Sequence, residues 1–155
     1  MFSFLDDMVG AQDVPPPEPP HLDCLQDILS KKYTLLLAYV HYGDQLRAYF
    51  RDGVYEHFQE HIKEERAQIY ALNKKITALG GDAEVSPEKV PNAPLADASA
   101  VFHLLLKMEL EVVAKWSELF HATPDDVPLN ALAQEGALID QQHADDMRRY
   151  LRSGS

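Results

Sequence analysis

Asp140 and His143 are three residues apart in a segment with helical periodicity, so their side chains share one helical face, one turn apart. A carboxylate and an imidazole at this spacing can bind a metal ion when carboxylates from facing helices complete the ligand set. Glu65 and Glu109 are candidates for those carboxylates, because each falls within the apolar stripe of its own segment. An unpartnered charge in a buried stripe is costly, so we expect these side chains to meet partners on neighbouring helices.

Four segments have apolar residues at every third or fourth position, which predicts four amphipathic helices. The first two are expected to be antiparallel, because only a short break at Asp52-Gly53 separates them. Gly80-Gly81 should end the second helix, since glycine is common just after a helix C-terminus. The predicted helices run from about Leu22 to Arg51, from that break to Leu79, from about Ala98 to His121, and, after Pro124 and Pro128, through Leu129 to Leu151.

The stretch from Gly80 to about Asp97 is rich in proline and has no periodicity. It is far longer than a turn between neighbouring helices needs, which predicts a crossover that runs the length of the bundle. The expected fold class is therefore all-α: a four-helix bundle, residues 22–152, with a long crossover between helices two and three.

Each predicted helix interrupts its apolar stripe near its middle with a polar residue. Lys32 does so on the first helix, between Ile28 and Leu36. Glu65, Glu109 and the Asp140/His143 pair do so on the others. One such residue would be unremarkable, but four at similar height indicate a polar centre inside the bundle.

Residues 1–21 differ from the rest: a short apolar patch precedes a Pro-rich segment, Val14 to Pro20. Such a segment favours extended polyproline geometry and serves as a spacer. Two interpretations stay open for this flexible N-terminal part. It is either a disordered tail that folds back on the bundle, or a tethered peptide that docks on a partner protein.

Composition narrows the classes of partner. The 155-residue chain has 46% hydrophobic residues and a formal charge of −11, which argues against nucleic acid and favours metal cations. No stretch approaches a membrane span, so no membrane partner is expected. One cysteine, Cys24, and the lack of an evident signal peptide predict a cytoplasmic protein.

The chain resembles ferritin-like four-helix proteins, above all bacterioferritin and the Dps-like ferritins. The resemblance covers about Leu22 to Leu151 and includes short sequence segments such as Glu60-His-Ile-Lys-Glu-Glu65 and Asp140-Gln-Gln-His143. Tyr39 lies seven residues after Lys32, as the family's aromatic follows its first-helix ligand, and Trp116 has the same offset from Glu109. The resemblance implies a dinuclear iron centre with two bridging carboxylates.

Carried onto this chain, that dinuclear centre is degenerate. Lys32 stands in place of the first-helix glutamate, and Gln68 in place of the second-helix histidine. The other metal position keeps Glu109 and His143. Glu65 and Asp140 take the bridging places, although Asp140 is one methylene shorter than the usual glutamate.

Two interpretations of this centre remain. In the half-site hypothesis Glu65, Glu109, Asp140 and His143 hold one iron or other divalent ion, with the Lys32 ammonium paired to Glu65 or Asp140. In the alternative no metal binds, and these residues with Gln68 form a buried ion-pair and hydrogen-bond network. Tyr39, His61 and Trp116 would surround the centre in either case.

Several narrower expectations follow from the resemblance. His61 is expected on the helix shoulder, hydrogen-bonded or solvated, with replacement of the lost histidine ligand as a second option. The rest of the run Lys63–Arg66, apart from Glu65, should be solvated. Haem is not expected, because Arg66 takes the place of the haem-binding methionine. Efficient ferroxidase turnover is not expected from a single ion.

Two classes of function therefore stay open. The first is a ferritin-type protein that binds iron, within a homo-oligomer of at least two copies. The second is a non-catalytic ferritin-fold protein kept for assembly or partner binding, with the N-terminal peptide as a contact.

Overall fold

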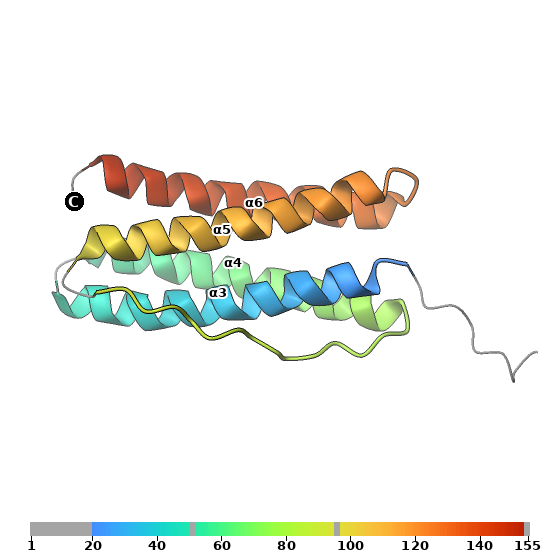
Figure 1. Cartoon of the computed structure of the whole chain (residues 1–155), viewed down its shortest axis with the longest axis horizontal. Coiled ribbons are helices and arrows are strands. Elements are labelled where there is room, and N and C mark those ends of the chain that lie inside the picture. Colours follow the sequence, from blue (N-terminus) through green and yellow to red (C-terminus); the bar gives the residue numbers. More distant parts are fainter. Residues whose placement is uncertain (1–19, 50–51, 95–96, 154–155) are drawn as a thin grey trace, which may run out of the picture.

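The computed structural model describes residues 20–49, 52–94 and 97–153, which form four helices and no strand. These helices form two antiparallel pairs, α3/α4 and α5/α6, which pack side by side (Figure 1). The predicted all-α four-helix bundle with a long crossover is confirmed. The helices are α3 (Leu22–Tyr49), α4 (Asp52–Ala78), α5 (Ala98–Ala122) and α6 (Val127–Arg152).

Two helix starts differ from the sequence prediction. The expected break at Asp52-Gly53 belongs to α4, whose first turn tolerates a glycine at small cost. Helix α6 begins at Val127 because the Asp126 carboxylate accepts a hydrogen bond from the Leu129 backbone N–H at 3.2 Å. Pro128 fits in the first turn, where backbone N–H groups have no partner within the helix.

Helix α4 ends at the predicted glycine pair. Gly80 has a positive φ of 86°, which few residues with a side chain adopt without strain. The Gly81 N–H donates to the Ile76 carbonyl and the Gly80 N–H to the Thr77 carbonyl, both at 3.0 Å. These two bonds form a Schellman motif, which satisfies carbonyls at the helix end and turns the chain into the crossover.

The crossover lies along α3 for most of its length (Figure 1). Side chains of α3 pair with several of its backbone groups, which holds this segment without secondary structure against the helix. The Glu88 N–H donates to the Thr34 hydroxyl at 2.9 Å, and the Tyr42 hydroxyl donates to the Pro91 carbonyl while accepting from the Ala93 N–H. Gln26 and Ser30 donate to crossover carbonyls nearer its start.

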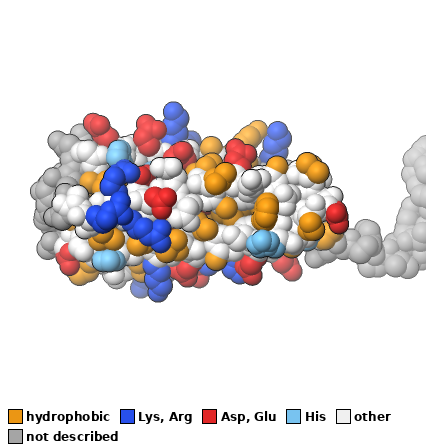
Figure 2. Space-filling view, turned by 90° about the horizontal axis from the view of Figure 1, so that it is seen from above, with side chains coloured by type: hydrophobic (Ala, Val, Ile, Leu, Met, Phe, Trp, Pro, Cys, Tyr) orange, Lys and Arg blue, Asp and Glu red, His pale blue; other side chains and the backbone are white. Residues whose placement is uncertain are grey.

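The face formed by α5 and α6 carries interspersed acidic, basic and hydrophobic side chains (Figure 2). Lys and Arg side chains gather toward the end of the bundle where α6 ends. Arg149 and Arg152 lie in the last turn of α6, where cations interact favourably with the helix dipole.

No helix among the described residues is long and apolar enough to cross a membrane. The expectations for the N-terminal peptide and tether fall almost wholly on residues 1–19, outside the described residues.

Candidate metal centre

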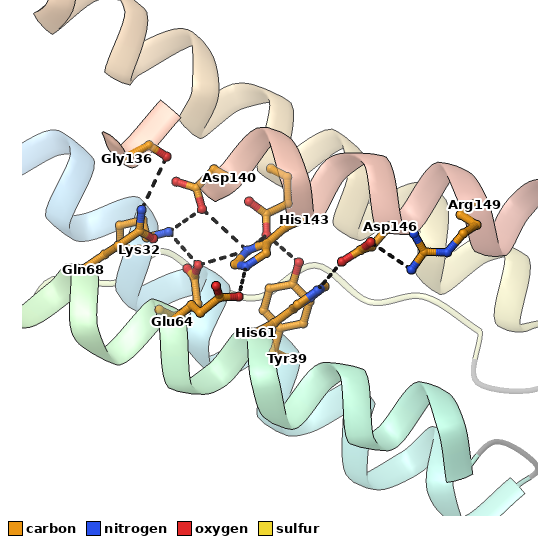
Figure 3. A network of polar contacts seen from close by, with 12 residues as sticks. Lys32, Tyr39, His61, Glu64, Gln68, Gly136, Asp140, His143, Asp146 and Arg149 are labelled. Carbon is orange, nitrogen blue, oxygen red and sulfur yellow. Dashed lines mark hydrogen bonds and ion pairs between the residues drawn. The ribbon is translucent and has the colours of Figure 1, made fainter. Parts of the chain in front are cut away.

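Five fully buried Lys, Glu, Asp and His side chains, contributed by all four helices, lie at the bundle centre, and Figure 3 labels Lys32, Asp140 and His143 among them. They point inward because each interrupts an apolar stripe that faces the bundle axis. One potential ligand atom from each of Glu65, Glu109, Asp140 and His143 lies within 4.8 Å of the others. The structure thus brings the four predicted ligands together. The five are Lys32 on α3, Glu65 on α4, Glu109 on α5, and Asp140 and His143 on α6.

Lys32 pairs with two carboxylates at once, rather than with one of the two that the sequence offered as alternatives. Its Nζ lies 2.6 Å from Glu65 Oε2 and 2.6 Å from Asp140 Oδ1. Burial opposes the charge on Lys32, but the attraction of Glu65 and Asp140 outweighs it and raises the pKa of Lys32 above its ordinary value. The ammonium therefore ties α3 to both α4 and α6.

His143 uses both ring nitrogens. Its Nδ1 lies 3.1 Å from Glu109 Oε2, 3.4 Å from Glu65 Oε2 and 3.7 Å from Asp140 Oδ1. Burial works against a charged imidazole, but hydrogen bonds to Glu109 and Glu65 outweigh it and raise the pKa of His143 to about 11. At neutral pH the ring is an imidazolium, and its Nδ1 proton points toward the three carboxylates.

Aromatic hydroxyl and indole groups orient two of the carboxylates, as the predicted positions of Tyr39 and Trp116 implied. The Tyr39 hydroxyl donates to Glu109 Oε2, and Trp116 Nε1 donates to Asp140 Oδ2 at 2.7 Å. Asp140, despite its shorter side chain, thus contacts Trp116 and Lys32 together. Burial, followed by repulsion from Asp140, raises the pKa of Glu109 to about 7.

Two carboxylate oxygens at the centre have no hydrogen-bond partner among the described residues. They are Glu65 Oε1 and Glu109 Oε1, both inaccessible to solvent. Buried acceptors are normally paired, so unpaired ones need an explanation. A cation bound between the carboxylates would explain the unpaired oxygens, because metals such as Fe and Zn are bound by carboxylate oxygens together with imidazole.

Sequence reasoning missed Glu64. It lies outside the apolar stripe and is exposed as expected, but its Oε1 also lies 2.9 Å from His143 Nε2. Its side chain is 47% exposed, so it links the buried imidazole to the surface. The contact depends on a side-chain rotamer that reaches around the helix, and the spacing of residues in the sequence does not predict rotamers.

His61 is buried and hydrogen-bonded, which is the first of the two states expected for it; it is not solvated. Its ring stacks on that of His143, with centroids 4.0 Å apart, and its Nε2 lies 2.9 Å from Asp146 Oδ2. Burial and the positive charge of His143 lower the pKa of His61 to about 4. Asp146 also pairs with Arg149 at 2.9 Å and was not singled out from sequence. Its position three residues after His143 was the available signal.

Gln68 does not join the network that the metal-free interpretation assigned to it. Its Nε2 donates to the Gly136 carbonyl at 3.4 Å, and its Oε1 has no partner among the described residues. Gly136 lies directly against the Trp116 ring, where an added Cβ would be 2.3 Å from a ring carbon. The helix backbone therefore holds the indole in the position from which it reaches Asp140.

A model of the ferritin family, described as the ferritin-like domain, matches residues 22–154. No curated protein matches the sequence. A crystal structure of ferritin-like, diiron-carboxylate proteins from Bacillus anthracis is similar, with a TM-score of 0.78 and 20% sequence identity over 84% of this chain and 94% of that chain.

A dodecameric thioferritin, the bacterioferritin-related protein from Bacteroides fragilis, is similar to the same degree. Its TM-score is 0.78 and its identity 20%, over 85% of this chain and 84% of that chain. These two likenesses confirm the ferritin-like fold.

Replacement of Gly136 by alanine should displace the Trp116 ring and weaken its bond to Asp140. We expect a loss of about 1–3 kcal/mol in the free energy of unfolding, as for other overpacked sites, and a shifted Trp116 fluorescence spectrum. Denaturant unfolding measures the first. Gly53→Ala is the matched control, because nothing lies within 4 Å of its added Cβ. Equal stability of both variants would contradict the packing argument.

The stability of the metal-free protein should fall as pH rises from 7 to 10. The pKa of His143 is about 11 in the folded state against 6.5 when unperturbed, so its stabilisation is complete below pH 6.5 and is lost toward pH 11. The raised pKa of Glu109 and the lowered pKa of His61 act below pH 7, in opposite directions.

Thermal melts in chelator should show a slope of at most about 1.4 kcal/mol per pH unit. His143→Gln should flatten this slope, whereas His103→Gln, at an exposed position, should keep it. A slope unchanged in His143→Gln would show that another group controls the pH dependence.

Proposed function

The chain belongs to the family of ferritin-like domains, and from this membership we propose that its bundle centre holds one divalent metal ion, iron in the first place. The ligands are Glu65, Glu109, Asp140 and His143. The observation that carries the proposal is their convergence within 4.8 Å, together with the unpaired buried oxygens on Glu65 and Glu109.

Charge supports one ion rather than two. Three carboxylates and the Lys32 ammonium leave two negative charges, which a single divalent cation neutralises. In the metal-free state His143 supplies positive charge instead, and its Nδ1 proton must leave before the nitrogen can act as a ligand. Lys32 stands on the side of the centre where the family's second ion would need a carboxylate.

Lys32 in place of the family's first-helix glutamate also limits the chemistry of the site. A bound iron would supply one-electron exchange, whereas ferroxidase chemistry in the family couples two adjacent ions. Lys32 and Gln68 remove the two ligands that a second ion needs. Metal binding or sequestration is therefore proposed, and efficient ferroxidase turnover is not.

Glu64 offers a route for the ion. Its side chain is half exposed and contacts His143 Nε2, so Glu64 would attract a cation at the surface next to the buried ligand set. Glu64 is thus a positioning residue for uptake and not a member of the buried ligand set.

A second candidate function has its own supporting observation. Lys32 already bridges Glu65 and Asp140 at 2.6 Å each, and the His143 imidazolium contacts three carboxylates, so most of the network is compensated without metal. In this alternative the protein is a non-catalytic member of the family, kept for assembly or partner binding, and the polar centre specifies the packing of its helices.

Metal-stripped protein titrated with Fe(II) without oxygen should bind one ion per chain. Glu109→Gln should weaken the binding at least tenfold, because it removes a charged ligand, whereas Glu111→Gln, exposed on the same helix, should not. Lys32→Glu combined with Gln68→His should bind a second ion. Calorimetry and elemental analysis give the stoichiometry.

The double variant also separates the two candidate functions. If the parent binds no ion while Lys32→Glu/Gln68→His binds metal, the half-site proposal is wrong and the metal-free network is favoured. Binding of two ions by the parent would also contradict the charge argument.

We also propose that the protein is a homo-oligomer of at least two copies. Leu37 and Val40 on α3 and Tyr70 on α4 are large apolar side chains that are 47%, 41% and 68% exposed. The similar protein from Bacteroides fragilis is described as dodecameric. Cytoplasmic location and a protein partner for the N-terminal peptide remain predictions.

Leu37→Glu combined with Val40→Glu should reduce the oligomer to smaller species, because each would bury a carboxylate in the contact. Native mass spectrometry measures the change. Leu138→Glu, on α6 and 66% exposed in this structure, is the control and should leave the mass unchanged. An oligomer that survives the α3 variant but not the α6 variant would place the contact elsewhere.

A further inference from the structure

Lys32 places a positive charge against carboxylates that the proposed ion would also need. Its Nζ lies 2.6 Å from Glu65 Oε2 and 2.6 Å from Asp140 Oδ1. His143 Nδ1, the ligand nitrogen, lies 3.4 Å and 3.7 Å from the same two oxygen atoms. An ion held by this nitrogen and these carboxylates therefore shares two of its ligand residues with the ammonium.

Burial makes the total charge of this pocket matter. The Lys32 side chain and the four ligand side chains are all fully buried. Water does not screen charges in such a place, so an uncompensated charge there costs far more free energy than it would at the surface. The sum of the charges in the pocket therefore restricts which ions it can hold.

That sum is two negative charges when His143 is a neutral ligand, because three carboxylates face one ammonium. The Tyr39 hydroxyl and the Trp116 indole are neutral donors and do not change it. Glu64 contacts His143 from outside, but its side chain is half exposed, so water screens its charge. A divalent ion thus leaves the pocket neutral, whereas a trivalent ion leaves one buried positive charge uncompensated.

We propose that Lys32 determines the charge of the ion at this centre: it admits divalent ions and excludes trivalent ions of similar size, so that bound iron is held as Fe(II). The inference rests on the proposed function, since it needs an ion at the centre. It assigns to Lys32 a selectivity that a glutamate at this position would not give, because a glutamate would leave four negative charges in the pocket.

Zn(II) and Ga(III) test this selectivity, because they are of similar size and neither changes its oxidation state. Both ions are supplied together in citrate to metal-stripped protein, and elemental analysis gives the ratio of bound gallium to bound zinc. The parent should bind zinc and almost no gallium. Lys32→Gln, which keeps a hydrogen-bond donor but removes the charge, should raise the ratio at least about a hundredfold, as expected when a unit charge next to the ion is removed.

Lys31→Gln is the matched control. It removes a lysine charge from the same helix, but Lys31 pairs with Glu88 on the crossover, outside the centre. This variant should keep the ratio of the parent. Lys32→Glu combined with Gln68→His, which restores the residues of the family, is a second variant without the Lys32 charge and should also raise the ratio.

The measurement on the parent needs no variant, so misfolding of either one leaves the inference testable. The inference is overturned if the parent takes up gallium as readily as zinc, or if a folded variant without the Lys32 charge keeps the ratio of the parent. A parent that binds neither ion contradicts the proposed function itself, and the inference fails with it. Zinc binding without selectivity against gallium overturns the inference alone.

Discussion

The rest of the bundle centre depends on the buried ion pairs that the Lys32 ammonium makes with Glu65 and Asp140. Ions removed from water are costly, and only close pairing with further hydrogen bonds repays that cost. Both Lys32 contacts are 2.6 Å, and they connect α3 with α4 and α6. Loss of one partner in a buried ion pair typically costs about 3–5 kcal/mol, so this ammonium constrains how the helices meet.

The surrounding groups keep that arrangement in register. Asp140 accepts from Lys32 on one oxygen and from Trp116 on the other, while Gly136, one turn earlier on α6, leaves the space that the indole needs. Glu109 is held by Tyr39 from α3. The crossover fixes α3 from outside. One positive side chain in a family of carboxylate centres thus changes both the charge of the site and the number of ions we expect it to hold.

Periodicity was sufficient to predict the fold and the convergence of the polar centre, because Glu65 and Glu109 interrupt apolar stripes that must face the bundle axis. Gly80-Gly81 predicted the end of α4, because glycine is common just after a helix C-terminus. The simultaneous pairing of Lys32, the reach of Glu64 to His143 and the rotation of Gln68 toward Gly136 were not predictable. Rotamers and the relative heights of helices decide these contacts, and both arise from packing across the bundle.

The most direct test of the central claim is a crystal of the protein soaked with Fe(II) without oxygen, with anomalous scattering measured at the iron edge. The account predicts one anomalous peak, bounded by Glu65, Glu109, Asp140 and His143, with Lys32 still present beside it. Two peaks, or a peak bound through His61 or Gln68, would contradict it. A map without any peak at the bundle centre would leave the polar network as a purely structural feature.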